Sequence, residues 1–122
     1  MARKETNVKA KRNSVVTVDE FRALTLEIPG SVESAHMAHP DFRIAGKVFA
    51  TLGYPDGEHG MVKLTREQQR TFLKKAPDVF SPSAGAWGKQ GSTNIYLRLA
   101  EIDLIRTALD LASKNVVRKT KA

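Results

Sequence analysis

The last third of the chain carries a helical apolar pattern that is too broad for a solvent-facing helix. From about Glu101 to Val117, apolar side chains recur at three- and four-residue spacing, and further apolar positions widen the stripe. The stripe contains Ile102, Leu104, Ile105, Ala108, Leu109, Leu111, Ala112 and Val116. A stripe of this breadth predicts a helix that packs against a sheet.

A second helix is predicted close to the N-terminus. Thr17 and Glu20 have the spacing of a capping box, in which each side chain satisfies a backbone N–H of the first turn. Apolar residues follow at helical spacing: Val18, Phe21, Leu24 and Ile28. The Pro29-Gly30 dipeptide is expected to end this helix.

The middle of the chain alternates between short apolar runs and turn residues. Ala45-Gly46 separates the runs Phe42–Ile44 and Lys47–Leu52, which predicts a tight hairpin with glycine at positive φ. A second capping box, at residues 65–68, opens a helix that Pro77 ends. Residues 94–99 alternate apolar and polar as one more strand.

Together these elements predict an α+β domain with an antiparallel sheet, its helices gathered on one side, and a helix inserted between strands. A length of 122 residues allows one domain. We expect residues 1–13 to form a flexible basic arm, 14–117 the single folded domain and 118–122 a basic tail. Residues 81–91, which hold three glycines and Trp87, are predicted to form a loop.

The net charge of +7 is concentrated at the two ends of the chain. Residues 1–13 and residues 114–122 each carry a net charge of +4, whereas residues 14–113 carry −1. Basic ends attract polyanions without sequence preference, and they also serve simply to keep a protein soluble. The charge pattern leaves both interpretations open.

Several classes of protein are excluded or disfavoured by what the sequence lacks. Because there is no cysteine, disulfides and thiolate metal sites are excluded, and a cytoplasmic location is expected. No apolar run has the length of a membrane span, so no membrane partner is expected. The sequence contains no nucleophile elbow, phosphate-binding loop or zinc-protease motif. We therefore predict a protein that is not an enzyme, with no catalytic residues and no cofactor.

The histidines are the candidate metal ligands. His36 and His39 lie three residues apart, and His59 follows in a later turn. Pro40 favours an extended conformation at His39, so alternation along one strand would place His36 and His39 on opposite faces. We therefore assign no metal site.

Cationic and aromatic residues form the other candidate site. Guanidinium and ammonium groups beside aromatic rings suit phosphate contact and base stacking. The predicted nucleic-acid contacts are Arg43, Lys47, Lys63, Trp87, Lys89 and Arg98. Two alternatives stay open: the arginines pair with acids, or Trp87 fills the core below the glycine-rich loop.

Several short motifs occur in a fixed order along the chain. They are Leu26-Glu27-Ile28-Pro29-Gly30, then Glu33 and His36, His39-Pro40-Asp41-Phe42-Arg43, Gly46-Lys47-Val48-Phe49-Ala50, Lys63-Leu64-Thr65, and Trp87-Gly88-Lys89-Gln90-Gly91-Ser92-Thr93. This ordered set resembles the MmcQ/YjbR family over roughly residues 17–117. The resemblance implies a frataxin-like α+β fold: a twisted antiparallel sheet with the N- and C-terminal helices packed on one face.

The same resemblance implies a function. The family is described as having a double-wing hairpin arrangement and as DNA-binding by fold analogy, with no catalytic residues to transfer. It implies that Arg43, Lys47 and Lys89 are anion contacts and that Trp87 is a platform or loop anchor. The leading hypothesis is thus a DNA-binding module of low sequence specificity. The alternative is a protein- or small-ligand-binding domain that uses the Trp87 loop and a groove at His36, His39 and Phe42. The oligomeric state is left open.

Overall fold

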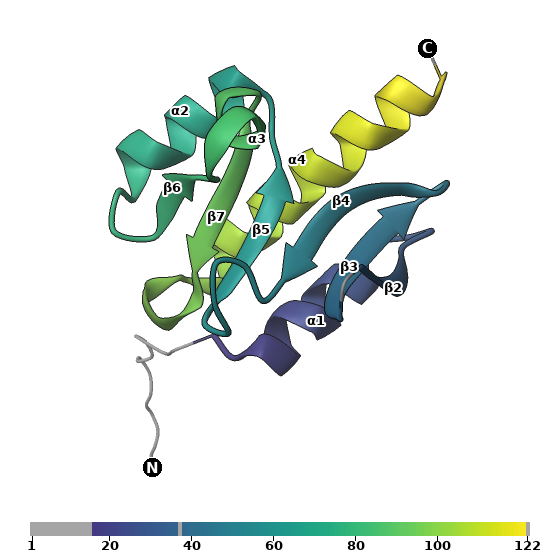
Figure 1. The fold of residues 1–122 in the computed structure, drawn as a ribbon, viewed down its shortest axis with the longest axis horizontal. Coiled ribbons are helices and arrows are strands. Elements are labelled where there is room, and N and C mark those ends of the chain that lie inside the picture. Colours follow the sequence, from purple (N-terminus) through teal and green to yellow (C-terminus); the bar gives the residue numbers. More distant parts are fainter. Residues whose placement is uncertain (1–15, 37, 122) are drawn as a thin grey trace.

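Six antiparallel strands form one open, twisted sheet in the order β2-β3-β4-β5-β7-β6 (Figure 1). The structure is a computed structural model that describes residues 16–36 and 38–121. The strands are β2 (Val32–His36), β3 (His39–Ile44), β4 (Lys47–Leu52), β5 (His59–Lys63), β6 (Phe80–Pro82) and β7 (Ser92–Tyr96).

The helices are α1 (Val18–Leu26), α2 (Arg66–Lys75), α3 (Gly85–Lys89) and α4 (Ile102–Lys121), with a 3-10 turn, η1 (Leu97–Leu99), between β7 and α4. α4 packs against β3, β4 and β5, and α1 packs against β5 and α4, so the N- and C-terminal helices cover the same face of the sheet (Figure 1). α2 is inserted between β5 and β6. The predicted α+β architecture is confirmed.

Both predicted capping boxes are present. At the start of α1, the Oγ1 of Thr17 accepts the backbone N–H of Glu20 at 3.0 Å, and Oε1 of Glu20 accepts the N–H of Thr17 at 2.9 Å. At the start of α2, Thr65 and Gln68 make the same reciprocal pair. Each box satisfies two backbone donors that a helix end otherwise leaves without partners.

The predicted β3–β4 hairpin also forms. Ala45 and Gly46 both have positive φ, 53° and 80°, as a type I′ turn requires. Further along the hairpin, the pairing shifts between Phe42 and Arg43, so that Phe42 pairs with Ala50 while Arg43 pairs with Val48. This bulge places Phe49 and Ala50 both in the core and leaves Val48 and Thr51 both lining the opposite face.

The core lies between the sheet and the pair α1 and α4. Phe42 is fully buried there, and its ring meets the ring of Phe21 edge-to-face at 6.5 Å between centroids. The expectation that Phe42 lines a groove is therefore wrong: this side chain belongs to the α1 side of the sheet.

Three further details differ from the sequence expectations. Residues 81–91 contain the end of β6 and the short helix α3 rather than only a loop. The strand predicted over residues 94–99 stops at Tyr96 and turns into η1, which leaves Leu99 exposed. α4 continues to Lys121, past the predicted domain end at residue 117. The predicted arm at residues 1–13 lies outside the described residues.

Candidate binding groove on the open sheet face

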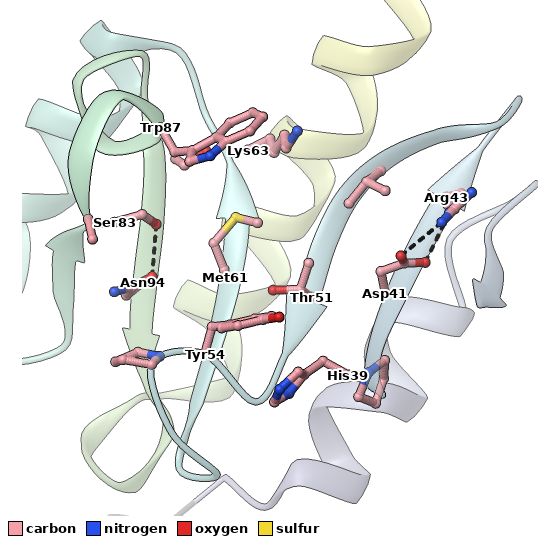
Figure 2. Close-up of a pocket in the computed structure, with 15 residues that line it drawn as sticks. His39, Asp41, Arg43, Thr51, Tyr54, Met61, Lys63, Ser83, Trp87 and Asn94 are labelled. Carbon is pink, nitrogen blue, oxygen red and sulfur yellow. Dashed lines mark hydrogen bonds and ion pairs between the residues drawn. The ribbon is translucent and has the colours of Figure 1, made fainter. Parts of the chain in front are cut away.

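The face of the sheet that α1 and α4 leave uncovered forms a groove of about 580 Å³ (Figure 2). We call it the sheet groove. Its floor is formed by side chains of β4, β5 and β7: Val48, Thr51, Met61, Ser92 and Asn94. The volume lies in the range of natural small-molecule sites, and convergent polar groups on a mostly apolar surface are typical of such sites.

The walls come from segments far apart in the sequence. On one side lie His39, Pro40, Asp41 and Arg43 of β3; on the other lie Ser83, Ala84 and Trp87 around α3, and Tyr54, Pro55 and Lys63 complete the lining. Figure 2 shows Trp87 and Lys63 together at one end and Tyr54 near His39 at the other. We call these the Trp87 end and the Tyr54 end.

Close backbone packing holds α3 at the Trp87 end. A Cβ on Gly88 would lie 1.8 Å from the carbonyl oxygen of Ser83, and a Cβ on Gly91 would lie 2.0 Å from that of Leu64. Gly91 also has a φ of +120°, which side-chain-bearing residues rarely adopt. Only glycine fits at these two positions, so the backbone of the Trp87-Gly88-Lys89-Gln90-Gly91 segment packs directly against the backbone of Ser83 and Leu64.

A buried side-chain amide also holds this segment in place. The Nε2 group of Gln69, on α2, donates to the carbonyl oxygens of Gly88 at 3.0 Å and Ser92 at 2.9 Å. Buried hydrogen bonds of this kind fix a unique geometry, because a buried donor or acceptor without a partner costs free energy. α3 is thus anchored through α2 and β7, although it is only five residues long.

This anchored helix presents an exposed tryptophan. Trp87 is 62% exposed, so the alternative that it fills the core is wrong. The Nζ of Lys63 lies 4.8 Å from the ring centroid, in cation–π range. A large aromatic ring that stays exposed on a rigid support is the feature that binding surfaces share, because its ordering entropy is already lost before the partner arrives.

Arg43 and Asp41 form a two-point ion pair on the β3 wall. The Nε and an Nη of Arg43 each donate to a carboxylate oxygen of Asp41 at 3.0 Å (Figure 2). The Asp41 side chain is only 3% exposed, whereas that of Arg43 is 35% exposed. Hydrogen bonding and the charge of Asp41 raise the pKa of the Arg43 guanidinium. Arg43 therefore neutralises a buried carboxylate and offers the groove only part of its donor capacity.

At the Tyr54 end, aromatic rings pack on histidines. The rings of His39 and Tyr54 lie 4.2 Å apart between centroids, and those of His59 and Tyr96 lie 5.2 Å apart. Gly53 permits the first contact, since a Cβ there would lie 2.6 Å from Nδ1 of His39. His39 is therefore held by local packing as part of the groove wall.

The expected arrangement of His36 and His39 on one continuous strand was wrong. The two residues are Cα partners at the end of the β2–β3 hairpin, with the chain reversing between them. Within residues 16–36 and 38–121, no group of three or more His, Cys, Asp or Glu side chains is placed to hold a metal ion.

Polar groups just beyond the Tyr54 end pair with one another. Nδ1 of His59 lies 2.8 Å from Oδ1 of Asp56, and Arg98 lies 3.7 Å from Glu58. Asp56 also accepts the backbone N–H of Glu58. The hydrogen bond from His59, with this backbone bond, lowers the pKa of Asp56. The alternative that the arginines pair with acids is confirmed for both Arg43 and Arg98.

Four of the predicted cations lie along the same edge of the sheet, spread from β3 to α3. Strand register places Arg43, Lys47 and Lys63 at the ends of β3, β4 and β5 that face the same side, and Lys89 lies on α3 just before β7 (Figure 1). Arg98 lies at the opposite end, in η1 after β7. The sequence prediction missed Tyr54, Met61, Ser83 and Asn94. Alternation in β5 and β7 could have identified Met61 and Asn94, but not which face of the sheet is open.

A second, smaller cavity adjoins the sheet groove. It has a volume of about 420 Å³. It is bounded by the start of α2, by α3 and by residues 115 and 116 of α4. Its lining includes Arg66, Gln90 and Asn115, and it shares Lys63, Trp87 and Ser92 with the sheet groove. We call it the helix hollow.

Comparison with known proteins establishes the fold. No family model matches the chain, and no curated protein matches it. Among solved structures, the chain is similar to protein DR2400 of Deinococcus radiodurans, whose family-model domain is DUF419. That similarity has a TM-score of 0.73 and 18% sequence identity, and covers 87% of this chain and 82% of that chain. Within the described ranges, no helix combines the length and apolarity needed to cross a membrane.

Proposed function

We propose that this protein is a non-enzymatic nucleic-acid-binding module that uses the Trp87 end of its open sheet face. The observation that carries the proposal is the exposed Trp87 ring, anchored by Gln69 and by close glycine packing, with Nζ of Lys63 4.8 Å from its centroid. Aromatic rings bind bases by stacking, and neighbouring cations bind phosphates. Lys47 and Lys89 are exposed along the same edge of the sheet, and the basic residues at the chain ends would add attraction without sequence preference.

We also propose membership of the MmcQ/YjbR family. The ordered motifs over residues 26–93 support it, and so does a sheet with the N- and C-terminal helices on one face. The fold similarity to a DUF419 protein is consistent with a small α+β family of this kind. A cytoplasmic location belongs to the same proposal, since a chain without cysteine suits a reducing compartment.

A salt titration tests the nucleic-acid proposal. Three phosphate contacts, from Lys47, Lys63 and Lys89, predict that affinity falls by at least about 40-fold for a duplex and about 20-fold for a single strand between ~50 and ~200 mM salt, and contacts from the chain ends would steepen this fall. Fluorescence anisotropy of labelled DNA measures this. As a control, glutamine replaces the basic residues of 1–13 and 118–121 in the full chain. If that variant binds neither form of DNA at low salt, the folded domain is not the binding unit.

The sheet groove favours a second candidate, a protein- or small-ligand-binding domain. The lining of the sheet groove is largely apolar, and the rings of His39 and Tyr54 pack against each other at one end of it, which phosphate contacts do not require. This candidate predicts salt-independent binding that raises the melting temperature. Amide chemical-shift mapping with an aromatic fragment set would detect it: shifts confined to β3, β4 and β5 without any DNA affinity would favour this candidate.

A further inference from the structure

Trp87 stands between two hollows of different chemistry. The sheet groove and the helix hollow share Lys63, Trp87 and Ser92, so Trp87 lines both cavities. A ligand longer than either cavity has to pass beside this ring. The two sides of the ring therefore define what the two parts of such a ligand must be.

The sheet-groove side suits a flat, weakly polar group. Val48, Met61 and Ala84 supply apolar surface, while Ser83 and Asn94 supply polar atoms on the same side of the groove as Trp87. Ser83 already donates to Asn94 at 2.8 Å, so the Nδ2 amide hydrogens of Asn94 are the donors that remain at this wall. One aromatic face with a few amide groups is the arrangement that recognises a nucleobase.

The helix-hollow side suits an anion. Lys63 and Arg66 line it, and none of the described residues that line it is acidic. Asn115 does not supply donors, because its amide already donates to the Lys63 carbonyl and to Gln68. The N–H groups of Thr65 and Gln68 are likewise used in the capping box. The exposed side chains of Arg66 and Gln90, with the charge of Lys63, are thus the groups that can meet a phosphate.

We infer that the nucleic-acid ligand is a single strand and that one nucleotide straddles Trp87, with its base in the sheet groove and its phosphate in the helix hollow. The inference rests on the proposed function. A base inside a duplex is already stacked on both faces and cannot reach an indole, whereas an unpaired base can. Duplex recognition would use the cations alone and would leave Trp87 exposed.

Trp87 is the only tryptophan in the protein, so intrinsic fluorescence reports directly on the site. The probes are an oligothymidylate of about 12 nucleotides, within the ~4–16-nucleotide range of comparable single-strand sites, and the same strand annealed to its complement. Thymidine 5′-monophosphate, thymidine and inorganic phosphate complete the set. We expect the single strand to quench Trp87 and to bind at least ~10-fold more tightly than the duplex. We expect the monophosphate to quench more than thymidine at equal concentration.

Two variants of α2 test the phosphate site. Arg66→Gln removes a cation of the helix hollow, whereas the matched Arg70→Gln removes an exposed cation of the same helix that lines neither cavity. We expect Arg66→Gln to weaken binding of the oligothymidylate and of the monophosphate about 10-fold and of thymidine less than ~2-fold. Arg70→Gln should change each affinity by less than ~2-fold. Both positions are exposed, and a melting curve checks that each variant is folded.

The outcomes separate the inference from the proposed function. Duplex binding as tight as single-strand binding, with Trp87 fluorescence unchanged, overturns the inference and keeps nucleic-acid binding. Equal effects of Arg66→Gln and Arg70→Gln on the monophosphate overturn the phosphate assignment. Absence of any nucleic-acid binding at ~50 mM salt overturns both. If Trp87 responds to the monophosphate but not to the oligothymidylate, the ligand is a free nucleotide, and the inference that a single strand binds is overturned.

Discussion

The two ends of the open sheet face differ in whether their partnered polar side chains are exposed or buried. Just beyond the Tyr54 end, exposed carboxylates pair locally: Asp56 with His59, and Glu58 with Arg98. At the Trp87 end, the partnered polar group is buried: Gln69 donates to two backbone carbonyls and holds α3. The exposed carboxylates near the Tyr54 end pair with nearby side chains. The buried side chain of Gln69 at the Trp87 end instead holds the helix that carries Trp87. Substitutions at the two ends should therefore have very unequal effects.

The largest expected difference comes from a pair of glycine substitutions. Gly91→Ala places a Cβ 2.0 Å from the Leu64 carbonyl oxygen at a φ of +120°, so we expect a loss of about 3 kcal/mol or more in unfolding free energy. Gly57→Ala, near the Tyr54 end, has nothing within 4 Å of its Cβ and should change stability by less than ~0.5 kcal/mol. Guanidinium unfolding measures both. Similar losses for the two variants would remove the contrast between the ends.

The next difference concerns the two arginine pairs. Arg43→Gln leaves the carboxylate of Asp41 buried without its cation, which we expect to cost about 2–3 kcal/mol of unfolding free energy. Arg98→Gln breaks an exposed 3.7 Å pair and should cost less than ~0.5 kcal/mol. Adding Asp41→Asn to Arg43→Gln should restore part of the loss. If it restores none, the cost came from the arginine stem and not from the unpaired charge.

A smaller effect is expected from the buried amide. Gln69→Leu removes two donors, but the Gly88 carbonyl keeps a bond from Gly91 and the Ser92 carbonyl keeps one from Ser83. We therefore expect about 1–2 kcal/mol of lost stability, with lower fluorescence anisotropy of Trp87 as α3 loosens. Gln90→Leu, on the exposed side of the same segment, is the control. Unchanged anisotropy in Gln69→Leu would show that glycine packing alone anchors the helix.

The smallest effect is a pH dependence at the Tyr54 end. Because the pKa of Asp56 is lowered in the folded state, its contribution to stability is present above the usual carboxyl pKa of ~3.9 and is lost as the pH falls through the lowered value. Asp56→Asn should therefore flatten the decline of the melting temperature toward pH ~3. Since Asp56 is exposed, we expect a difference of about 2 °C or less. A steeper decline in the variant would contradict the assignment.

Local signals in the sequence predicted most of the fold. Thr17 and Thr65 begin helices because hydroxyl caps are short-range chemistry, and Gly46 closes a hairpin for the same reason. α3 was missed because Ala84 offers no side-chain cap and the segment has no apolar stripe. Its helical form depends on contacts with Ser83, Leu64 and Gln69, which sequence spacing does not reveal.

The candidate site was predicted only in part, and for a physical reason. Alternation tells that Phe42 and Arg43 point to opposite faces of β3, but not which face the helices cover. The shift of register beside Phe42 then changes which residues of β4 share a face. Lys63 and Trp87 were predicted from residue type alone. Their contact at 4.8 Å depends on where tertiary contacts hold α3.

The strand order has a consequence for how the chain folds as it is synthesised. β7 pairs with β5 and β6, and α4 covers β3, β4 and β5, so the central part of the sheet is completed by segments made after its other strands. A nascent chain that ends before residue 92 leaves β5 without a partner on one side and the apolar face of the hairpins in contact with water. Productive folding should therefore wait until α4 leaves the ribosome, and until then the growing chain is the form most exposed to aggregation and to chaperones.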